Sequence, residues 1–153
     1  ALWCAATDER FALAVSNNAG CSGDALTRGK QGERVEDITR NFPFWFCQNY
    51  RRYAGAEERM PFDQHWLLAA IARFVNAAEQ DLWADPESEF LCCAAAGEFY
   101  ERMKLDGFAA DDRTPVPGDF FGAGRIGFAM RSGSHFLSRA DWNAAIRFWK
   151  AKG

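Results

Sequence analysis

Short apolar runs alternate with amphipathic segments along this chain of 153 residues. The runs cover 11–15, 74–78 and 126–130, and polar or turn-forming residues bound them. A continuous apolar run such as 11–15 is typical of a strand buried on both faces. The pattern therefore predicts three strands, of which the third is weakened by Gly127.

Two helices are predicted from their start signals. Asp63 is a candidate N-cap for a helix over 64–72, and Asp85-Pro86 is the expected opening of a long helix that runs until Gly107. The residues expected on the inner face of the first helix are Trp66, Leu67, Ala70 and Ile71. Those expected along one face of the second are Leu91, Ala95, Phe99 and Met103.

Other helices are expected over 1–6, 34–40 and 44–53. Residues 108–124 are rich in Gly, Pro and Asp and are predicted to form a loop. Ser138 and Asp141 resemble a capping box that starts the last helix. The apolar positions of that helix are Trp142, Ala145, Ile146 and Trp149.

This alternation of helices and strands predicts an α/β layer fold with about three parallel strands joined by crossover helices. Parallel sheets are rarely left uncovered at an edge, so we expect further strands before Ala1. Residues 1–153 would then form one partial domain.

Composition excludes several classes of protein. Hydrophobic residues make up 48% of the chain and charged residues 25%, as in ordinary globular proteins. No apolar run reaches the roughly 18 residues of a membrane span, so no membrane partner is expected. The net charge of −3 disfavours nucleic acid as a partner. Five cysteines without a CxxC pair, and two distant histidines, predict no metal site.

Candidate chemistry lies after the predicted strands, because ligands bind beyond the carboxyl ends of open α/β sheets. Asp81 follows the second strand and His135 the third. An acid followed by a histidine in this order matches the last two members of the α/β-hydrolase triad. His135 would be the general base and Asp81 the carboxylate that orients it. The alternatives are a solvated histidine and a helix cap, the role we expect for Asp85.

The nucleophile of such a triad is not found in the sequence. The segment 20–23 (Gly-Cys-Ser-Gly) only superficially matches G-x-S-x-G, because Asp24 stands where the second Gly is required. Ser22 is expected to serve a turn, and Cys21 stays open as a thiol nucleophile. We expect the nucleophile elbow before Ala1. His65 is expected to be structural.

The motifs resemble those of the glucuronoyl esterases, a carbohydrate esterase family of α/β-hydrolase fold, and above all its bacterial members. The segments that carry the resemblance are Ala1-Leu2-Trp3 with Asp8–Ala12, Ser16–Gly23, Pro61–Ala69, Asp81–Glu87 and Arg131–His135.

The resemblance implies cleavage of lignin-carbohydrate esters of (4-O-methyl)glucuronic acid on xylan by a Ser-His-acid triad, without cofactor or metal. His135 matches the catalytic histidine. Some members place a Glu where this chain has Asn18, so the acid role falls to Asp81. Trp83 resembles a substrate-contacting Trp, with core packing as its alternative. The family likeness also implies a secreted or periplasmic protein.

Three other functions stay open. The chain could belong to an acetylxylan esterase or another acyl esterase, since the sugar specificity depends on the resemblance alone. It could also be a non-catalytic carbohydrate-binding or interaction module, with the aromatic segment 42–53 and Trp83 as its contact surface. A gene fragment without function is the third possibility. Any activity is expected to require the missing N-terminal half, so the chain alone should be inactive.

Overall fold

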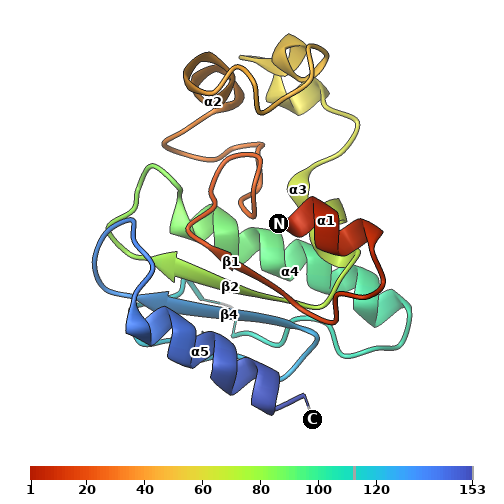
Figure 1. The fold of residues 1–153 in the computed structure, drawn as a ribbon, viewed down its shortest axis with the longest axis vertical. Helices are drawn as coiled ribbons and strands as arrows, with labels where there is room; N and C mark the ends of the chain where they lie inside the picture. The colour runs from red at the N-terminus through yellow and green to blue at the C-terminus, as the bar shows by residue number, and fades with distance from the viewer. Residues whose placement is uncertain (112, 153) are drawn as a thin grey trace.

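The protein folds around a mixed four-stranded sheet (Figure 1). The computed structural model describes residues 1–111 and 113–152. The strand order is β1-β2-β4-β3, with β1, β2 and β4 parallel and β3 antiparallel to β4. The strand bounds are Ala14–Asn17 (β1), Arg73–Ala78 (β2), Phe120–Phe121 (β3) and Ile126–Arg131 (β4). The predicted parallel α/β arrangement is confirmed.

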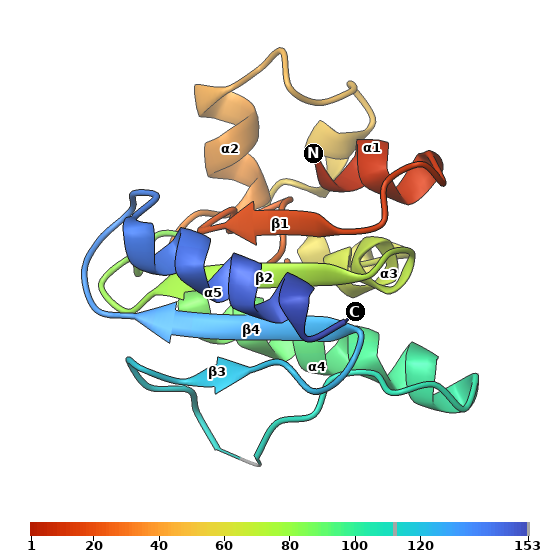
Figure 2. The same ribbon diagram turned by 60° about the horizontal axis from the view of Figure 1, so that its bottom comes forward.

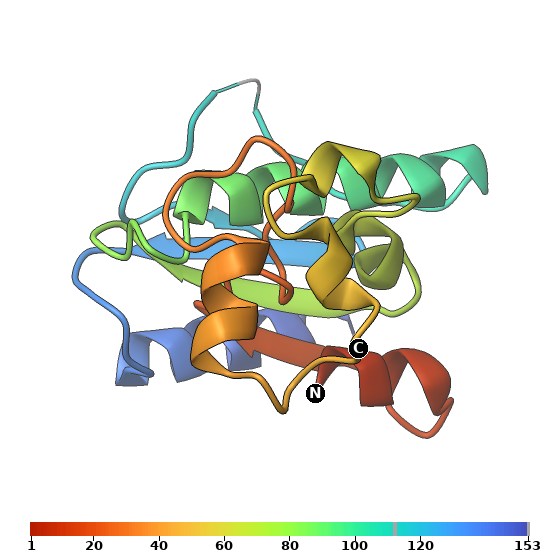
Figure 3. The same cartoon turned by 90° about the horizontal axis from the view of Figure 1, so that it is seen from above.

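Helices cover both faces of this sheet. Figure 3 shows α4 on one face and α5 on the other. The helix bounds are Leu2–Thr7 (α1), Val35–Asn41 (α2), Gln64–Ala69 (α3), Pro86–Arg102 (α4) and Arg139–Lys150 (α5). Two single turns of 3-10 helix span Tyr50–Tyr53 (η1) and Glu57–Arg59 (η2).

The core forms because β2 is buried along its whole length, between two neighbouring strands and two helix layers. On one face Val75 and Ala77 pack with Phe90 of α4, and on the other Phe74 packs on Phe148 of α5 with ring centres 5.1 Å apart. Aromatic pairs at such distances add to the stabilisation from apolar burial. The central strand therefore gives the following loop a rigid base.

The first strand differs from its prediction. It begins at Ala14 rather than Phe11, and Val15 and Phe11 are exposed. The prediction of burial on both faces is wrong. Val15 is level with Phe74 and shares its face of the sheet, but α5 covers that face over β2 and β4.

Four further boundaries were predicted incorrectly. The long helix that Asp85 caps ends at Arg102 rather than at Gly107. Only Tyr50–Tyr53 is helical within 44–53, where turns take the place of a regular helix. The helix that Asp63 caps ends at Ala69, three residues early. The predicted loop 108–124 contains β3, whose two residues are too few to give a strand pattern.

The predicted apolar faces also need correction. Leu91 on α4 and Met103 just after it are exposed, and so is Trp66 on α3. The side chains that α4 buries against the sheet include Phe90, Cys93, Ala96 and Tyr100. On α5, Ala145 and Phe148 are buried, while Trp142, Ile146 and Trp149 are exposed. The capping box of Ser138 and Asp141 is confirmed.

Candidate active site

The loops after β2 and β4 lie side by side at the carboxyl end of the sheet (Figure 2). Parallel pairing of these strands brings them there, and two backbone hydrogen bonds extend the pairing into the loops. The Glu79 amide donates to the Arg131 carbonyl at 2.9 Å, and the Gln80 amide donates to the Gly133 carbonyl at 3.0 Å. Asp81 and His135 follow one and two residues later, so their separation is set by backbone geometry.

The structure brings His135 and Asp81 into direct contact. Nδ1 of the imidazole lies 2.7 Å from Oδ2 of the carboxylate. The carboxylate side chain is 7% exposed, whereas the imidazole is 67% exposed. An ionised carboxylate has only acceptors, so Nδ1 carries the proton in this contact and Nε2 is left to accept another. A buried acid that orients an accessible base is the arrangement needed for general-base chemistry.

Asp81 and Asp85 have different partners. Oδ1 of Asp81 accepts the Ala84 amide at 3.3 Å, which leaves Oδ2 for the imidazole. The Asp85 carboxylate caps α4 by accepting the Ser88 amide at 3.2 Å and also accepts the Gln31 amide at 2.7 Å. The predicted cap role of Asp85 is confirmed.

Trp83 lies on the same loop and about half of it is exposed (52%). This exposure counts against the core-packing alternative. The Trp83 carbonyl accepts the Glu33 amide at 2.9 Å and the Lys30 ammonium at 3.3 Å. The indole is thus a half-exposed apolar surface on the loop that carries Asp81.

Asn18 directly follows β1, at the place where some family members carry a Glu. It is buried (3% exposed), and neither of its side-chain polar atoms has a hydrogen-bond partner in the described part of the chain. The imidazole is held by Asp81 instead.

Cys21 and Ser22 do not form a nucleophile. Cys21 is buried, and burial raises the pKa of its thiol to about 11, so the thiol stays protonated at neutral pH. The Ser22 hydroxyl lies 2.5 Å from the Tyr50 hydroxyl, within a turn where Ser22 has a φ of 63°. The open alternative of a Cys21 thiolate is therefore wrong.

His65 lies on α3, away from the strand ends. Its ring packs near Trp66 and Phe99, with ring centres 6.4 and 6.0 Å away, and burial lowers its pKa. These contacts agree with a structural role.

The sequence did not identify two buried charged residues that contact the loop after β2. Glu33 and Lys30 are both nearly fully buried, and they contact the Trp83 segment from the loop before α2. Burial raises the pKa of Glu33 and lowers that of Lys30. Neither residue belongs to a local motif, so only the three-dimensional contact identifies them.

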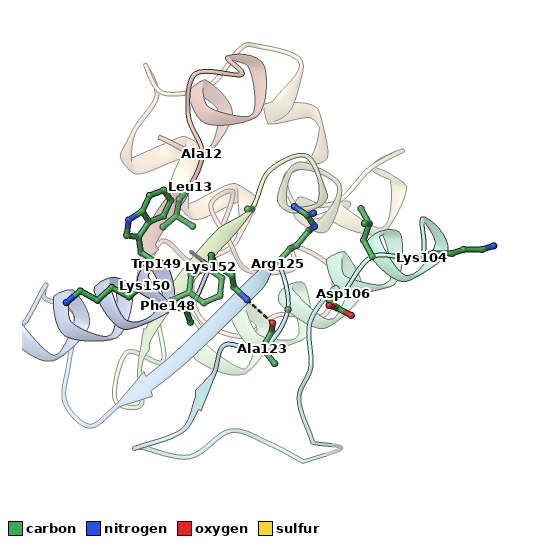
Figure 4. A pocket seen from close by; sticks show the side chains of 14 residues that line it. Ala12, Leu13, Lys104, Asp106, Ala123, Arg125, Phe148, Trp149, Lys150 and Lys152 are labelled. Carbon is green, nitrogen blue, oxygen red and sulfur yellow. Dashed lines mark hydrogen bonds between the residues drawn. The ribbon is translucent and has the colours of Figure 1, made fainter.

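A large cavity of about 880 Å³ lies at the opposite end of the sheet (Figure 4). Residues that precede the strands line it, together with the last turn of α5. Lys104 and Lys150 extend away from it, and the Lys152 ammonium donates to the carbonyls of Gly122 and Ala123 at 3.0 and 2.7 Å. Its lining contains no paired acid and base among the described side chains.

Residues 1–111 and 113–152 contain no cluster of three His, Cys, Asp or Glu side chains suited to a metal ion. In the same residues, no helix combines the length and the hydropathy of a membrane span.

A family model described as glucuronyl esterase, fungi, matches residues 1–104. The match covers more than half of the chain. The chain belongs to the glucuronyl esterase family. The resemblance inferred from the motifs is confirmed.

Curated members of the glucuronyl esterase family align with much of this chain. A carbohydrate esterase from an unknown prokaryotic organism is 39% identical over 150 residues, which are 96% of this chain and 34% of that protein. A 4-O-methyl-glucuronoyl methylesterase from Schizophyllum commune is 30% identical over 113 residues, 67% of this chain and 29% of that protein. The chain thus spans about a third of the length of the curated relatives it matches.

Solved structures of glucuronyl esterase relatives have the same fold. A glucuronoyl esterase from Solibacter usitatus is 35% identical with a TM-score of 0.90, covering 99% of this chain and 39% of that one. A promiscuous CE15 esterase from the marine bacterial metagenome is 39% identical with a TM-score of 0.92, covering 97% of this chain and 38% of that one. The predicted α/β-hydrolase class is therefore confirmed.

Proposed function

We propose that this chain supplies the base and the acid of a serine-type carboxylic ester hydrolase that cleaves (4-O-methyl)glucuronoyl esters in lignin-carbohydrate complexes of xylan. The observation that carries the proposal is the 2.7 Å contact between His135 Nδ1 and Asp81 Oδ2. Support for the substrate class comes from the names of the relatives, which include 4-O-methyl-glucuronoyl methylesterases.

In the proposed reaction, Nε2 of His135 accepts the proton of a serine hydroxyl as the serine oxygen attacks the uronoyl carbonyl carbon. The alcohol then leaves with the proton that Nε2 returns. Water, deprotonated by the same nitrogen, then attacks the carbonyl carbon of the acyl-serine, and the uronic acid is released as Nε2 returns that proton to the serine oxygen. Asp81 stabilises the imidazolium in both halves of the reaction, and no cofactor takes part.

We place the serine, with the nucleophile elbow and the N-terminal strands, in a segment that residues 1–153 do not contain. The one-sided pairing of β1 agrees with this proposal, and so does coverage of only about a third of the relatives. We also propose that Trp83 stacks on the sugar ring, since its indole is half-exposed on the loop that carries Asp81. The working location would be secreted or periplasmic, as for an enzyme that acts on plant cell walls.

The test joins the chain to a serine donor. Residues 1–153 replace the matching segment of the Solibacter usitatus glucuronoyl esterase, and hydrolysis of a benzyl glucuronate ester is measured. The chimaera should be active and the isolated chain inactive. His135→Ala in the chimaera should lower kcat by about 10⁶-fold, as loss of the base does in a comparable triad.

The matched control is His65→Ala, which removes the other histidine of the chain. It should leave kcat within about threefold, since His65 is placed as a structural residue of α3. Equal losses in the two variants, or a His135→Ala chimaera that keeps its activity, would refute the assignment. Activity on acetylated xylan in preference to the uronate ester would favour the acetylxylan esterase alternative.

A non-catalytic carbohydrate-binding module is the second candidate, and one observation favours it. Phe44 and Trp45 are exposed, and Trp45 stacks on Phe42 with ring centres 4.1 Å apart. Aromatic rings presented in this way suit sugar binding. Xylan-fragment binding by the isolated chain that survives His135→Ala, together with an inactive chimaera, would support this candidate over the esterase.

A further inference from the structure

The loop that carries His135 folds around one side chain, that of Arg131 at the end of β4. Its Nε donates to both carboxylate oxygens of Asp141, at 3.0 and 2.8 Å. Nη1 donates to the Ser132 carbonyl at 3.1 Å, and Nη2 donates to the carbonyls of Ser134, at 3.1 Å, and Phe136. The two terminal guanidinium nitrogens therefore hold the segment on either side of the imidazole, while Nε joins the group to α5.

The guanidinium is also packed within this loop. Its carbon lies 4.0 Å from the centre of the Phe136 ring, and the Arg131 side chain is only 13% exposed. Gly133 makes the tight turn of the loop with a φ of +101°, and a Cβ there would lie 3.2 Å from Arg131 Nη1. The loop backbone is thus wrapped closely against the planar group.

The imidazole has little packing of its own, because the His135 side chain is 67% exposed. Apart from its contact with Asp81, its position therefore depends on the backbone that carries it. That backbone is held by Arg131, by the Gln80–Gly133 hydrogen bond and by Asn17 Nδ2, which donates to the Phe136 carbonyl at 3.3 Å.

Asp141 anchors the far side of this arrangement. Its Oδ2 also accepts the Ser138 amide at 2.6 Å, and the Ser138 hydroxyl accepts the Asp141 amide at 3.2 Å, which completes the capping box of α5. Arg131, the last residue of β4, is thus bonded to the first turn of α5, and the His135 loop lies between these two elements.

We propose that Arg131 is a positioning residue for His135: its fork of donors sets the loop geometry in which the imidazole presents Nδ1–H to Asp81. The catalytic meaning of this role rests on the proposed function, but the geometry can be tested without hydrolysis. A lysine cannot replace it, because one compact ammonium cannot reach a carboxylate and three carbonyls in a fixed plane.

The experiment reads the histidine tautomers of the isolated 153-residue chain by long-range ¹H–¹⁵N correlation NMR at a pH of about 8.5, where an ordinary imidazole is neutral. The chain has two histidines, so His65 is an internal reference. In the unchanged chain His135 should be the Nδ1–H tautomer. In Arg131→Met the ratio of Nδ1–H to Nε2–H should fall by about tenfold, the effect of losing one charge-assisted hydrogen bond.

Arg131→Lys keeps a cation for Asp141 and should show the same tautomer shift with a smaller loss of thermal stability. The matched control is Arg147→Met, which removes another stacked guanidinium, 3.9 Å from the Phe120 ring centre on α5. It should leave the His135 ratio unchanged. If Arg131→Met does not fold, the ratio of the two His135 tautomers in Arg131→Lys tests the proposal in its place.

An unchanged His135 ratio in both Arg131 variants would overturn the proposal, and so would an equal shift in Arg147→Met. The proposed function can fail separately. An inactive chimaera combined with an Arg131-dependent tautomer would remove the esterase assignment and leave the positioning role in place.

Discussion

Asp81 and Asp85 lie four residues apart on one loop, and their different surroundings give them different roles. Asp81 turns one oxygen to an accessible imidazole, whereas both oxygens of Asp85 accept backbone amides. A carboxylate hydrogen-bonded to an exposed imidazole can stabilise the imidazolium that forms during a reaction, while a carboxylate occupied as a helix cap cannot take that role without loss of the helix start. The difference lies in which groups each side chain meets, since both are aspartates on one loop.

At this scale the sequence predicted the residues whose position follows from strand ends. Asp81 and His135 come directly after apolar runs, so their meeting was predictable from the parallel sheet. Glu33, Lys30 and Arg131 were not identified, because their roles depend on carbonyls and amides of distant segments. Side-chain type and spacing do not encode such contacts.

Glu89 gives a pH-dependent prediction at the residue scale. It is fully buried on α4 and accepts the Gly20 amide at 3.0 Å, and Asp24 is buried beside it. Burial raises the pKa of both carboxyl groups, and the Asp24 charge raises that of Glu89 further. The folded state therefore holds protons more tightly than the unfolded state. The stability this contributes is full below the ordinary pKa and is lost as pH rises through the raised one.

Glu89→Gln keeps an acceptor for the Gly20 amide and cannot ionise. Urea denaturation should show nearly equal unfolding free energies for the two proteins at a pH of about 4, and an advantage for the variant that grows as the pH is raised to about 8. Glu98→Gln, an exposed position on the same helix, should give no such trend. A constant difference between Glu89→Gln and the parent across this range would contradict the prediction.

At the scale of elements, the loop before α2 is hydrogen-bonded to the loop after β2. The Gln31 amide donates to Asp85, and the Lys30 ammonium and the Glu33 amide donate to the Trp83 carbonyl. These contacts hold the segment that carries Asp81 and Trp83.

Gly32 lets the two loops approach closely. It has a φ of +64°, and a Cβ there would lie 2.4 Å from the Leu82 carbonyl oxygen and 2.5 Å from that of Trp83. Gly32→Ala should therefore cost about 3 kcal/mol or more of unfolding free energy, measured by urea denaturation.

Gly29→Ala is the matched control for this prediction. Gly29 has a similar φ of +73°, but a Cβ there meets nothing within 4 Å. It should cost only the strain of a left-handed backbone, about 1 kcal/mol. Equal costs at the two positions would show that the close approach does not matter.

Elements with strong start signals were the predictable ones. Asp63, Asp85 and Ser138 each cap a helix as expected. The segment 44–53 was not predictable, because its many aromatic residues fit a helix pattern although few of them are buried. Its side chains pack around Tyr50 and Phe46 instead of forming a helix face.

At the scale of the whole molecule, the site lies at one end of the sheet and the large cavity at the other. The class of fold was predictable from the alternation of strands and helices. The burial of individual faces was not, since Trp142, Ile146 and Trp149 of α5 are apolar and yet exposed. The spacing of apolar residues predicts that a helix has an apolar face, but it does not predict whether another element packs against that face. In the described residues this face of α5 is exposed.

The central claim is that His135 and Asp81 act as one catalytic unit, and a double-mutant cycle in the chimaera tests it most directly. Asp81→Asn alone should lower kcat for the glucuronate ester by about 10⁴-fold, with Asp85→Asn within about threefold of the parent as the control. In a His135→Ala background, Asp81→Asn should cause no further loss, because an orienting carboxylate has no effect without the imidazole. Losses that multiply in the double variant, or a larger loss from Asp85→Asn than from Asp81→Asn, would contradict the account.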